Sequence, residues 1–253
     1  MPYAAPSNGS MLTGMPNRIA IVAALEREIR PLVKDWHVSA REHDGRSFKF
    51  FEDDHTVAVC GGIGAQAARR ACEAVISLYQ PSLVISAGVA GALQSDIAPG
   101  SGFTPRTVVD AQDGSRTDVG SGTGILVTVG SVIGRGQKAA MAKSYGAQAA
   151  DMEAAAVARG AQARSVPFCA IKAISDGVDS DLPPIDRFIR HDGQLHTAKF
   201  IAYVAMRPWL WRSTWKLARD SARASNTLCK LLQHASAADQ ELSLHPAGAT
   251  PNH

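Results

Sequence analysis

Two carboxylates of this 253-residue chain occupy positions where an acid is energetically costly. Glu153 follows Met152 at the start of an expected alanine-rich helix, and Asp176 ends the apolar run 166–174. Burial raises the pKa of an acid, and acids with displaced pKa values perform proton transfer in enzymes. Each acid has a purely structural alternative. Glu153 would then be a first-turn acid favoured by the helix dipole, and Asp176 an N-cap or turn residue.

A third acid, Glu28, lies just beyond the continuous apolar run 18–24. That run predicts a buried parallel strand, so Glu28 is expected near its carboxyl end. The alternative is an exposed helix acid beside Arg27 and Arg30. The chain therefore offers three acids near the ends of apolar segments.

The elements that must position these acids alternate between strands and helices. Apolar runs predict strands at 18–24, 57–60, 83–87, 124–129 and 168–174, and helical patterns cover 25–34, 65–79 and the segment from Met152. Such alternation predicts the α/β class, as a three-layer α/β/α sandwich around a mostly parallel, mixed central sheet.

Candidate site residues gather at the expected carboxyl ends of these strands. Glu28 and Asp176 are two of them, and the others are the glycine turns at Gly62, Gly88 and Gly130-Ser131. Ligands of open α/β sheets bind at this edge, so the convergence favours an enzyme. The loop-like segment 96–123 is either a flexible cover over the site or an ordinary connection.

Composition narrows the remaining classes. The chain has 26 basic and 23 acidic residues, and its net charge of +3 argues against general nucleic-acid binding. Its four cysteines show no C-x-x-C spacing, which favours reduced thiols in a cytoplasmic protein without a metal site. No apolar run reaches the eighteen residues typical of a transmembrane helix.

Five motifs occur in a telling order: Ile-Ala-Ile-Val-Ala-Ala-Leu-Glu-Arg-Glu (19–28), Gly-Gly-Ile-Gly (61–64), Ser-Ala-Gly-Val-Ala-Gly (86–91), Asp-Met-Glu-Ala (151–154) and Ala-Ile-Ser-Asp (173–176). Over roughly residues 18–179 the chain resembles the purine nucleoside phosphorylase superfamily, which includes the methylthioadenosine/adenosylhomocysteine nucleosidases. The resemblance implies a nucleoside phosphorylase-like fold and cleavage of a ribosyl C–N bond.

The resemblance also implies roles for individual residues. Glu153 would accept hydrogen bonds from the ribose 2′- and 3′-hydroxyls, and Met152 would pack against the sugar. Asp176 would be the general acid toward purine N7, with Ser175 orienting it. Glu28 corresponds to the glutamate that activates the attacking water in the nucleosidases of the family.

Base and anion subsites follow from the same resemblance. Ser131, Val132, Ile133 and Ser175 would contact the base, although Val132 replaces the usual aromatic residue. A phosphate or nucleophile pocket would involve Gly62, Gly64, Gly88 and Val89, because backbone N–H groups at glycine turns bind anions. Two positions depart from a standard phosphate site: Val89 stands for a serine, and Ser86 stands for the arginine of some phosphorylases.

The C-terminal part is basic and rich in tryptophan. Residues 199–230 either lie on an anionic membrane surface or form an amphipathic helix packed on the domain or a partner. This part resembles the hopanoid-associated phosphorylases, which act on adenosylhopane. The domain prediction has a disordered leader (1–17), a catalytic domain (18–198), a helical extension (199–233) and a disordered tail (234–253).

The sequence therefore predicts cleavage of an adenosine-type nucleoside with a bulky apolar 5′ group, by phosphorolysis, as in hopanoid biosynthesis. Inorganic phosphate would be the co-substrate, with no bound cofactor. The first alternative is a hydrolytic methylthioadenosine/adenosylhomocysteine nucleosidase. The second is a nucleoside-binding or membrane-associated protein without turnover. We expect a homo-oligomer, with a dimer favoured, in the cytoplasm or peripheral to the inner membrane.

Overall fold

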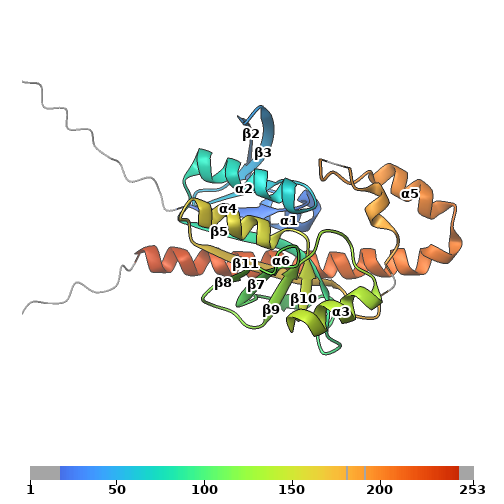
Figure 1. Ribbon diagram of the computed structural model, residues 1–253. Helices are drawn as coiled ribbons and strands as arrows, with labels where there is room; N and C mark the ends of the chain where they lie inside the picture. Colours follow the sequence, from blue (N-terminus) through green and yellow to red (C-terminus); the bar gives the residue numbers. More distant parts are fainter. Residues whose placement is uncertain (1–17, 181, 191, 245–253) are drawn as a thin grey trace, which may run out of the picture.

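The computed structural model describes residues 18–180, 182–190 and 192–244, which form one mixed sheet with helices packed on both faces (Figure 1). The sheet order is β2-β3-β4-β1-β5-β10-β9-β7-β8, and β11 lies between β5 and β6. The strands are β1 (Ile19–Ala23), β2 (His37–His43), β3 (Arg46–Glu52), β4 (Thr56–Cys60), β5 (Leu83–Ala92), β6 (Gly102–Phe103), β7 (Thr107–Asp110), β8 (Arg116–Asp118), β9 (Ile125–Thr128), β10 (Ala149–Asp151) and β11 (Phe168–Asp176).

The helices alternate with these strands. They are α1 (Glu26–Val33), α2 (Ala65–Tyr79), α3 (Arg135–Tyr145), α4 (Ala154–Ala163), α5 (Thr197–Ala205) and α6 (Trp211–Leu244), with short 3-10 helices η1 (Ile185–Phe188) and η2 (Pro208–Leu210). The predicted helix at 65–79 is confirmed at both ends, and Gln80 caps it in the left-handed conformation just before Pro81.

The central strand β1 shows why the sandwich forms. It pairs in parallel with β4 and β5. Ala20 and Val22 pack into a core with α2 and α4, whereas Ile19 and Ile21 pack into a second core with α1 and α6. Both faces are covered, so the strand is apolar throughout. The predicted α/β/α sandwich with a mixed sheet is confirmed.

The predicted glycine turn after residue 87 is wrong. β5 continues through Gly88 to Ala92, paired with β11 and, at its end, with β10. A Cβ on Gly91 would lie only 3.0 Å from Asp176 Oδ2. Glycine therefore allows the strand to approach a carboxylate closely at this position, and the chain does not turn.

Two sheet segments were not expected from the sequence. The stretch 96–123 contributes β6, β7 and β8, and Val108 and Val109 are buried in the sheet. The prediction of a flexible cover is wrong, because short strands are hidden among Gly, Ser and Asp residues. The β2–β3 hairpin was also missed, although Asp44-Gly45, both at positive φ, is a two-residue turn signal.

The C-terminal part divides into two regions. α5 and the first part of α6 stand apart from the sheet at one side of the molecule (Figure 1). Further along α6, Ala224, Leu228 and Leu232 are fully buried against β-strand side chains. The helix continues to Leu244, beyond the predicted end at residue 233. Residues 1–17 and 245–253, predicted to be disordered, lie outside the described residues.

None of the helices in the described ranges has the length and apolarity that crossing a bilayer requires.

Candidate active site

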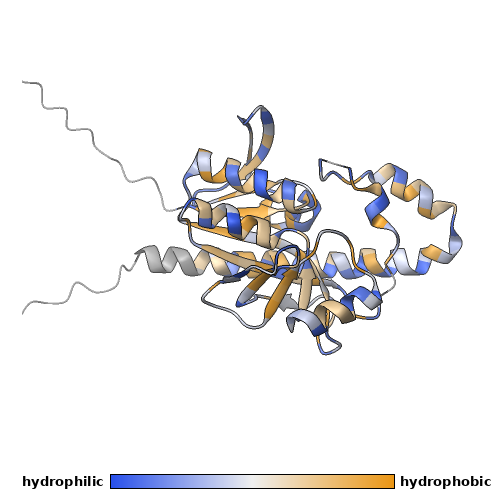
Figure 2. Cartoon of the chain, in the orientation of Figure 1, coloured by the Kyte–Doolittle hydropathy of each residue, from blue (hydrophilic) through white to orange (hydrophobic). Residues whose placement is uncertain are grey.

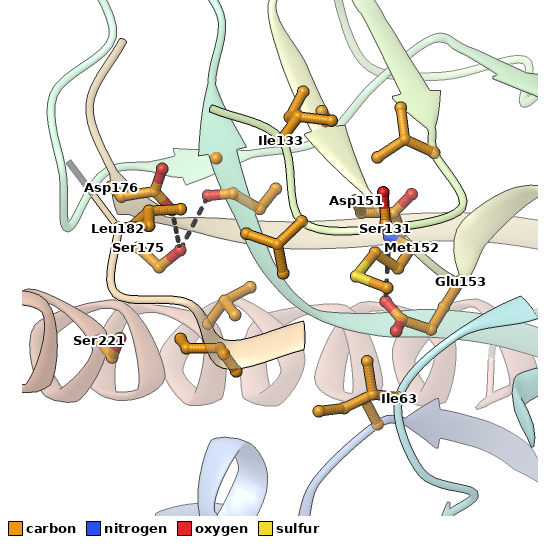
Figure 3. A pocket seen from close by; sticks show the side chains of 18 of the residues that line it. Ile63, Ser131, Ile133, Asp151, Met152, Glu153, Ser175, Asp176, Leu182 and Ser221 are labelled. Atoms are coloured by element: carbon orange, nitrogen blue, oxygen red, sulfur yellow. Dashed lines mark hydrogen bonds between the residues drawn. The ribbon is translucent and has the colours of Figure 1, made fainter. Parts of the chain in front are cut away.

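A pocket at one edge of the sheet brings most of the predicted site residues together. It is bordered by residues at or just beyond the ends of β1, β4, β9, β10 and β11, and by β5. The predicted residues that line it are Glu28, Val89, Ser131, Val132, Ile133, Met152, Glu153, Ser175 and Asp176. Gly62, Gly64 and Gly88 are not among the lining residues. Figure 3 shows Ser175 and Asp176 at one end of the pocket and Met152 and Glu153 at the other.

Glu153 lies at the amino end of α4, after the short strand β10. It is the N-cap residue, so the helix begins at Ala154, two residues after the predicted start at Met152. Its Oε1 accepts a hydrogen bond from Gly64 N at 2.8 Å, and Oε2 accepts one from Met152 N at 3.2 Å. Burial, followed by the nearby charge of Asp151, raises the pKa of Glu153 to about 7.

Glu28 folds back over the first turn of α1. Its Oε2 accepts a hydrogen bond from Leu25 N at 3.3 Å, and the side chain is buried. Burial raises its pKa, opposed by the Leu25 hydrogen bond and by the charges of Arg27 and Lys172. A buried acid with a raised pKa is a good candidate for a general base. The alternative of an exposed helix acid therefore does not describe Glu28.

Asp176 ends β11 and is held from two sides. Ser175 Oγ donates a hydrogen bond to Oδ1 at 2.7 Å, and Lys138 Nζ donates to Oδ2. Lys138 also donates to the carbonyl of Gly177 at 2.7 Å, and its side chain is buried although it comes from the distant helix α3. An ammonium thus faces the carboxylate within the pocket lining. The sequence around Lys138 contains no signal for this pair.

A second buried ion pair lies close to Glu153, and its member Asp151 also lines the pocket. Lys172 Nζ is 2.8 Å from Asp151 Oδ2 and 3.1 Å from Ser86 Oγ, and both charged side chains are fully buried. Asp151 also accepts hydrogen bonds from Thr128 Oγ1 and from Ala154 N. Sequence reasoning missed this pair, but a lysine inside the apolar strand 168–174 was a usable signal, because a buried lysine needs a partner.

The glycine turn after β4 has no N–H group available for an anion. Gly61 N and Gly62 N donate to the carbonyls of Ala23 and Ala24, and Ile63 N donates to that of Gly193. The fourth donor, Gly64 N, is bound to Glu153. The turn that was predicted as part of a phosphate pocket therefore connects β1, Gly193 and the Glu153 carboxylate.

Gly88 lies beside the two charged groups at the centre of the site. A Cβ on this residue would be 3.5 Å from Glu28 Oε2 and 3.7 Å from Lys172 Nζ, which is ordinary contact. Gly88 therefore lies next to both the Glu28 carboxylate and the Lys172 ammonium.

The predicted base-binding segment follows β9. Ile133 is buried and contributes to the core that contains Met152. Val132 N donates to Asp186 Oδ1 at 3.0 Å, which ties this segment to η1. Other apolar side chains complete the pocket, and they are Ile63, Leu182, Ile185, Ile189 and Leu217. Within the described residues no group of three or more His, Cys, Asp or Glu side chains is arranged to hold a metal ion.

Comparison with known proteins agrees with this architecture. The family model for the phosphorylase superfamily matches residues 12–122 and 112–204. The chain therefore belongs to the phosphorylase superfamily. None of the curated proteins compared with the chain gives a significant match.

Solved structures with the same fold are distant in sequence. Futalosine hydrolase of Helicobacter pylori is 18% identical with a TM-score of 0.66, over 89% of this chain and 99% of that one. A mutant of Helicobacter pylori MTAN with 5′-methylthioadenosine in its active site is 16% identical with a TM-score of 0.67, over 89% and 100%. The 5′-methylthioadenosine/S-adenosylhomocysteine nucleosidase from Neisseria meningitidis, bound to methylthio-immucillin-A, is 19% identical with a TM-score of 0.65, over 88% and 99%.

Proposed function

We propose that this protein is an enzyme that cleaves the N-glycosidic bond of a purine nucleoside. The observation that carries the proposal is the convergence of Glu28, Glu153 and Asp176, from three separate segments, on one pocket. Membership of the phosphorylase superfamily supports it, as do structural neighbours whose names describe nucleoside hydrolysis.

The sugar end of the pocket suits a developing positive charge. Breaking a ribosyl C–N bond proceeds through an oxocarbenium-like transition state. In the proposed mechanism Glu153 accepts hydrogen bonds from the ribose hydroxyls while Met152 packs against the ring. The pKa of Glu153 near 7 reflects a carboxylate whose charge is poorly stabilised by the protein around it. A cationic sugar would supply the missing stabilisation in the transition state.

The base end suits departure of an anionic purine. The pair of Asp176 and Lys138 holds an acidic proton beside the leaving group. In the proposed step the Lys138 ammonium passes a proton to Asp176, and Asp176 delivers this proton to purine N7 as the C–N bond breaks, which leaves Lys138 neutral. Ser175 keeps the carboxylate oriented through its 2.7 Å hydrogen bond. Protonation of this kind contributes about 10²–10⁴-fold in rate.

We infer that water is the attacking nucleophile. Glu28 lines the pocket, and its raised pKa makes this residue able to accept a proton. The N–H groups of the glycine turn are already bound within the protein. The two acids Glu28 and Glu153 would also repel a phosphate dianion. These features favour the hydrolytic alternative over the phosphorolysis that the sequence predicts.

Phosphorolysis remains the second candidate because of one residue. Arg27 is exposed and borders the pocket, where it could receive one face of a phosphate group. The resemblance of the C-terminal part to hopanoid-associated phosphorylases favours the same reaction. Inorganic phosphate would then be a co-substrate.

For the substrate we propose a nucleoside with a bulky apolar 5′ group, such as adenosylhopane. The apolar side chains of Ile63, Ile185 and Leu217 on the pocket wall support this choice. We also propose a cytoplasmic homodimer. The four free thiols support a reducing compartment.

The decisive experiment measures purine release from methylthioadenosine and from adenosylhopane, each with and without inorganic phosphate. Release from either nucleoside that is independent of phosphate, with the 5′-substituted ribose as product, supports hydrolysis. Release that requires phosphate and yields the 5′-substituted ribose 1-phosphate establishes phosphorolysis. No release from either substrate, by a protein that is folded by circular dichroism, overturns the proposed function.

A control variant links the result to the site. Glu28→Gln should abolish hydrolysis, whereas Glu42→Gln on the exposed hairpin strand β2 should leave it unchanged. Equal activities of the two variants would contradict the role of Glu28.

A further inference from the structure

Exposed apolar side chains are concentrated in one part of the molecule. Among the described residues the exposed large hydrophobic side chains are Val38 on β2 and five others, Ile201, Met206, Trp209, Trp211 and Trp215. All five belong to residues 197–219, here called the arm. Trp209 is 73% exposed and Met206 72%. Exposed clusters of this kind mark interaction sites.

The arm is also uniformly basic. It contains Lys199, Arg207, Arg212, Lys216 and Arg219 and no aspartate or glutamate. Along α5 and the start of α6, hydrophobic residues are interspersed with hydrophilic ones (Figure 2). Tryptophan beside lysine and arginine is typical of surfaces that lie at the boundary between lipid tails and anionic headgroups.

The arm is held by contacts within itself and with η1, so its exposed side chains are presented on an ordered support. Phe188 packs against Phe200 and Tyr203, with ring centroids 5.5 and 5.2 Å apart. Arg207 lies over the Tyr203 ring at 3.7 Å, and Trp211 Nε1 donates to the carbonyl of Val204. The remaining surface of the indoles faces outward.

Helix geometry separates the arm surface from the pocket. Trp211 and Trp215 are four residues apart and share one face of α6, and Leu217 and Ser221 share another that lines the pocket. Trp215 and Leu217 are two residues apart, which places them on opposite sides of the helix. The pocket therefore lies within about one helix diameter, roughly 10 Å, of the tryptophan surface.

We propose that the arm is a docking surface for an anionic lipid bilayer. A second copy of the chain fits it poorly, because a two-fold interface would bring five positive charges against the same five. The exposed indoles form a large apolar surface, and nucleic acid offers no apolar surface of similar extent to cover it. Docking itself goes beyond the proposed activity. Capture of an apolar 5′ group from the bilayer rests on the proposed function.

Vesicle binding tests the proposal without requiring turnover. The full-length protein is mixed with vesicles of phosphatidylglycerol and phosphatidylcholine in equal amounts, or of phosphatidylcholine alone, and sedimented. Three of the four tryptophans lie in the arm, so a blue shift of tryptophan emission reports the same event. We expect binding to the anionic vesicles, weakened by added salt, and little binding to phosphatidylcholine.

Two arm variants should lose this binding. Lys199→Gln with Arg212→Gln should lower the partition coefficient roughly 30-fold, and Trp209→Ser with Trp215→Ser about tenfold or more. The matched controls change the same chemistry elsewhere: Lys34→Gln with Arg46→Gln, and Val38→Ser. They should bind like the unaltered protein.

Absent binding of the unaltered protein, equal binding to both vesicle types, or arm variants that bind like their controls would overturn the proposal. The proposal would also be overturned if the unaltered protein formed a dimer that the tryptophan variant does not form, and if the unaltered protein did not bind vesicles. Purine release measured on the same preparations is a separate readout, so failure of docking and failure of the proposed function can be distinguished.

Discussion

The two ends of the pocket hold their acids in opposite ways. At the base end Asp176 is paired with the ammonium of Lys138. At the sugar end Glu28 and Glu153 receive backbone N–H groups, and within the described ranges of the chain neither has a cation at ion-pair distance. The buried pair of Asp151 and Lys172 lies close to this second group.

In the proposed mechanism, the difference matches the charge that develops at each end. A leaving purine needs a proton, which a carboxylate and ammonium pair can hold without adding net charge. A ribosyl cation needs negative charge that no protein cation has already neutralised. The negative charge at the sugar end is therefore poorly stabilised unless the substrate becomes positive. The raised pKa values of Glu28 and Glu153 agree with this.

The largest predicted effect tests the base end. Asp176→Asn should lower kcat/KM on a purine nucleoside by about 10²–10⁴-fold, and Lys138→Met should act in the same direction. A nitrophenyl riboside needs no proton on its leaving group, so both variants should cleave it nearly normally. The control is Lys143→Met, an exposed lysine on the same helix. Equal losses on both substrates would show that the pair does not serve the leaving group.

The buried pair close to the sugar end should be structural. Lys172→Met leaves Asp151 as an uncompensated buried charge and should cost about 3–5 kcal/mol of stability. The double variant Asp151→Asn with Lys172→Met should recover part of this loss. Denaturant unfolding measures both variants, and Lys34→Met at the surface should change little. A single variant as stable as the native protein would mean that the charges are not coupled.

The sugar end should weaken the fold at neutral and alkaline pH. The folded-state pKa of Glu153 is raised from 4.5 to about 7, so its contribution to stability is lost as pH rises through that range. Glu153→Gln should therefore gain stability relative to the native protein above pH 7, by up to about 3 kcal/mol, and nothing below pH 4.

Thermal unfolding across pH checks this prediction, with Glu42→Gln as the exposed control. A stability difference that does not depend on pH would remove the electrostatic contrast between the two ends.

The smallest predicted effect concerns base stacking. Val132 borders the pocket where the resemblance implies an aromatic residue. Val132→Phe should lower KM for a purine nucleoside about 2- to 10-fold, because a ring contact adds about 0.5–1.5 kcal/mol. The change in the free energy of substrate binding caused by Val132→Phe should add to the change caused by Glu153→Gln if the two ends act independently. A strongly non-additive double variant would show that the ends are coupled.

Much of the framework was predictable from local patterns. The runs at 18–24 and 168–174 were apolar because both faces of β1 and β11 are covered, and the helix 65–79 had clear boundaries. Strand ends then placed Glu28 and Asp176 at one edge. Short strands such as β7 escaped notice because four residues carry too little periodicity among turn-forming neighbours. The turn predicted at Gly88 was wrong because glycine also occurs inside strands, as at Gly91, where a Cβ would lie 3.0 Å from Asp176 Oδ2.

The sequence by itself determined the class of fold, the three acids and the sheet edge where they meet, because these depend on hydrophobic periodicity and on the order of elements along the chain. Only the tertiary structure decided which acids are neutralised. Lys138 reaches Asp176 across 38 residues, and Gly64 reaches Glu153 across 89. Hydrogen bonds and ion pairs act over a few ångströms, so spacing along the chain does not reveal them until the sheet and its helices have packed.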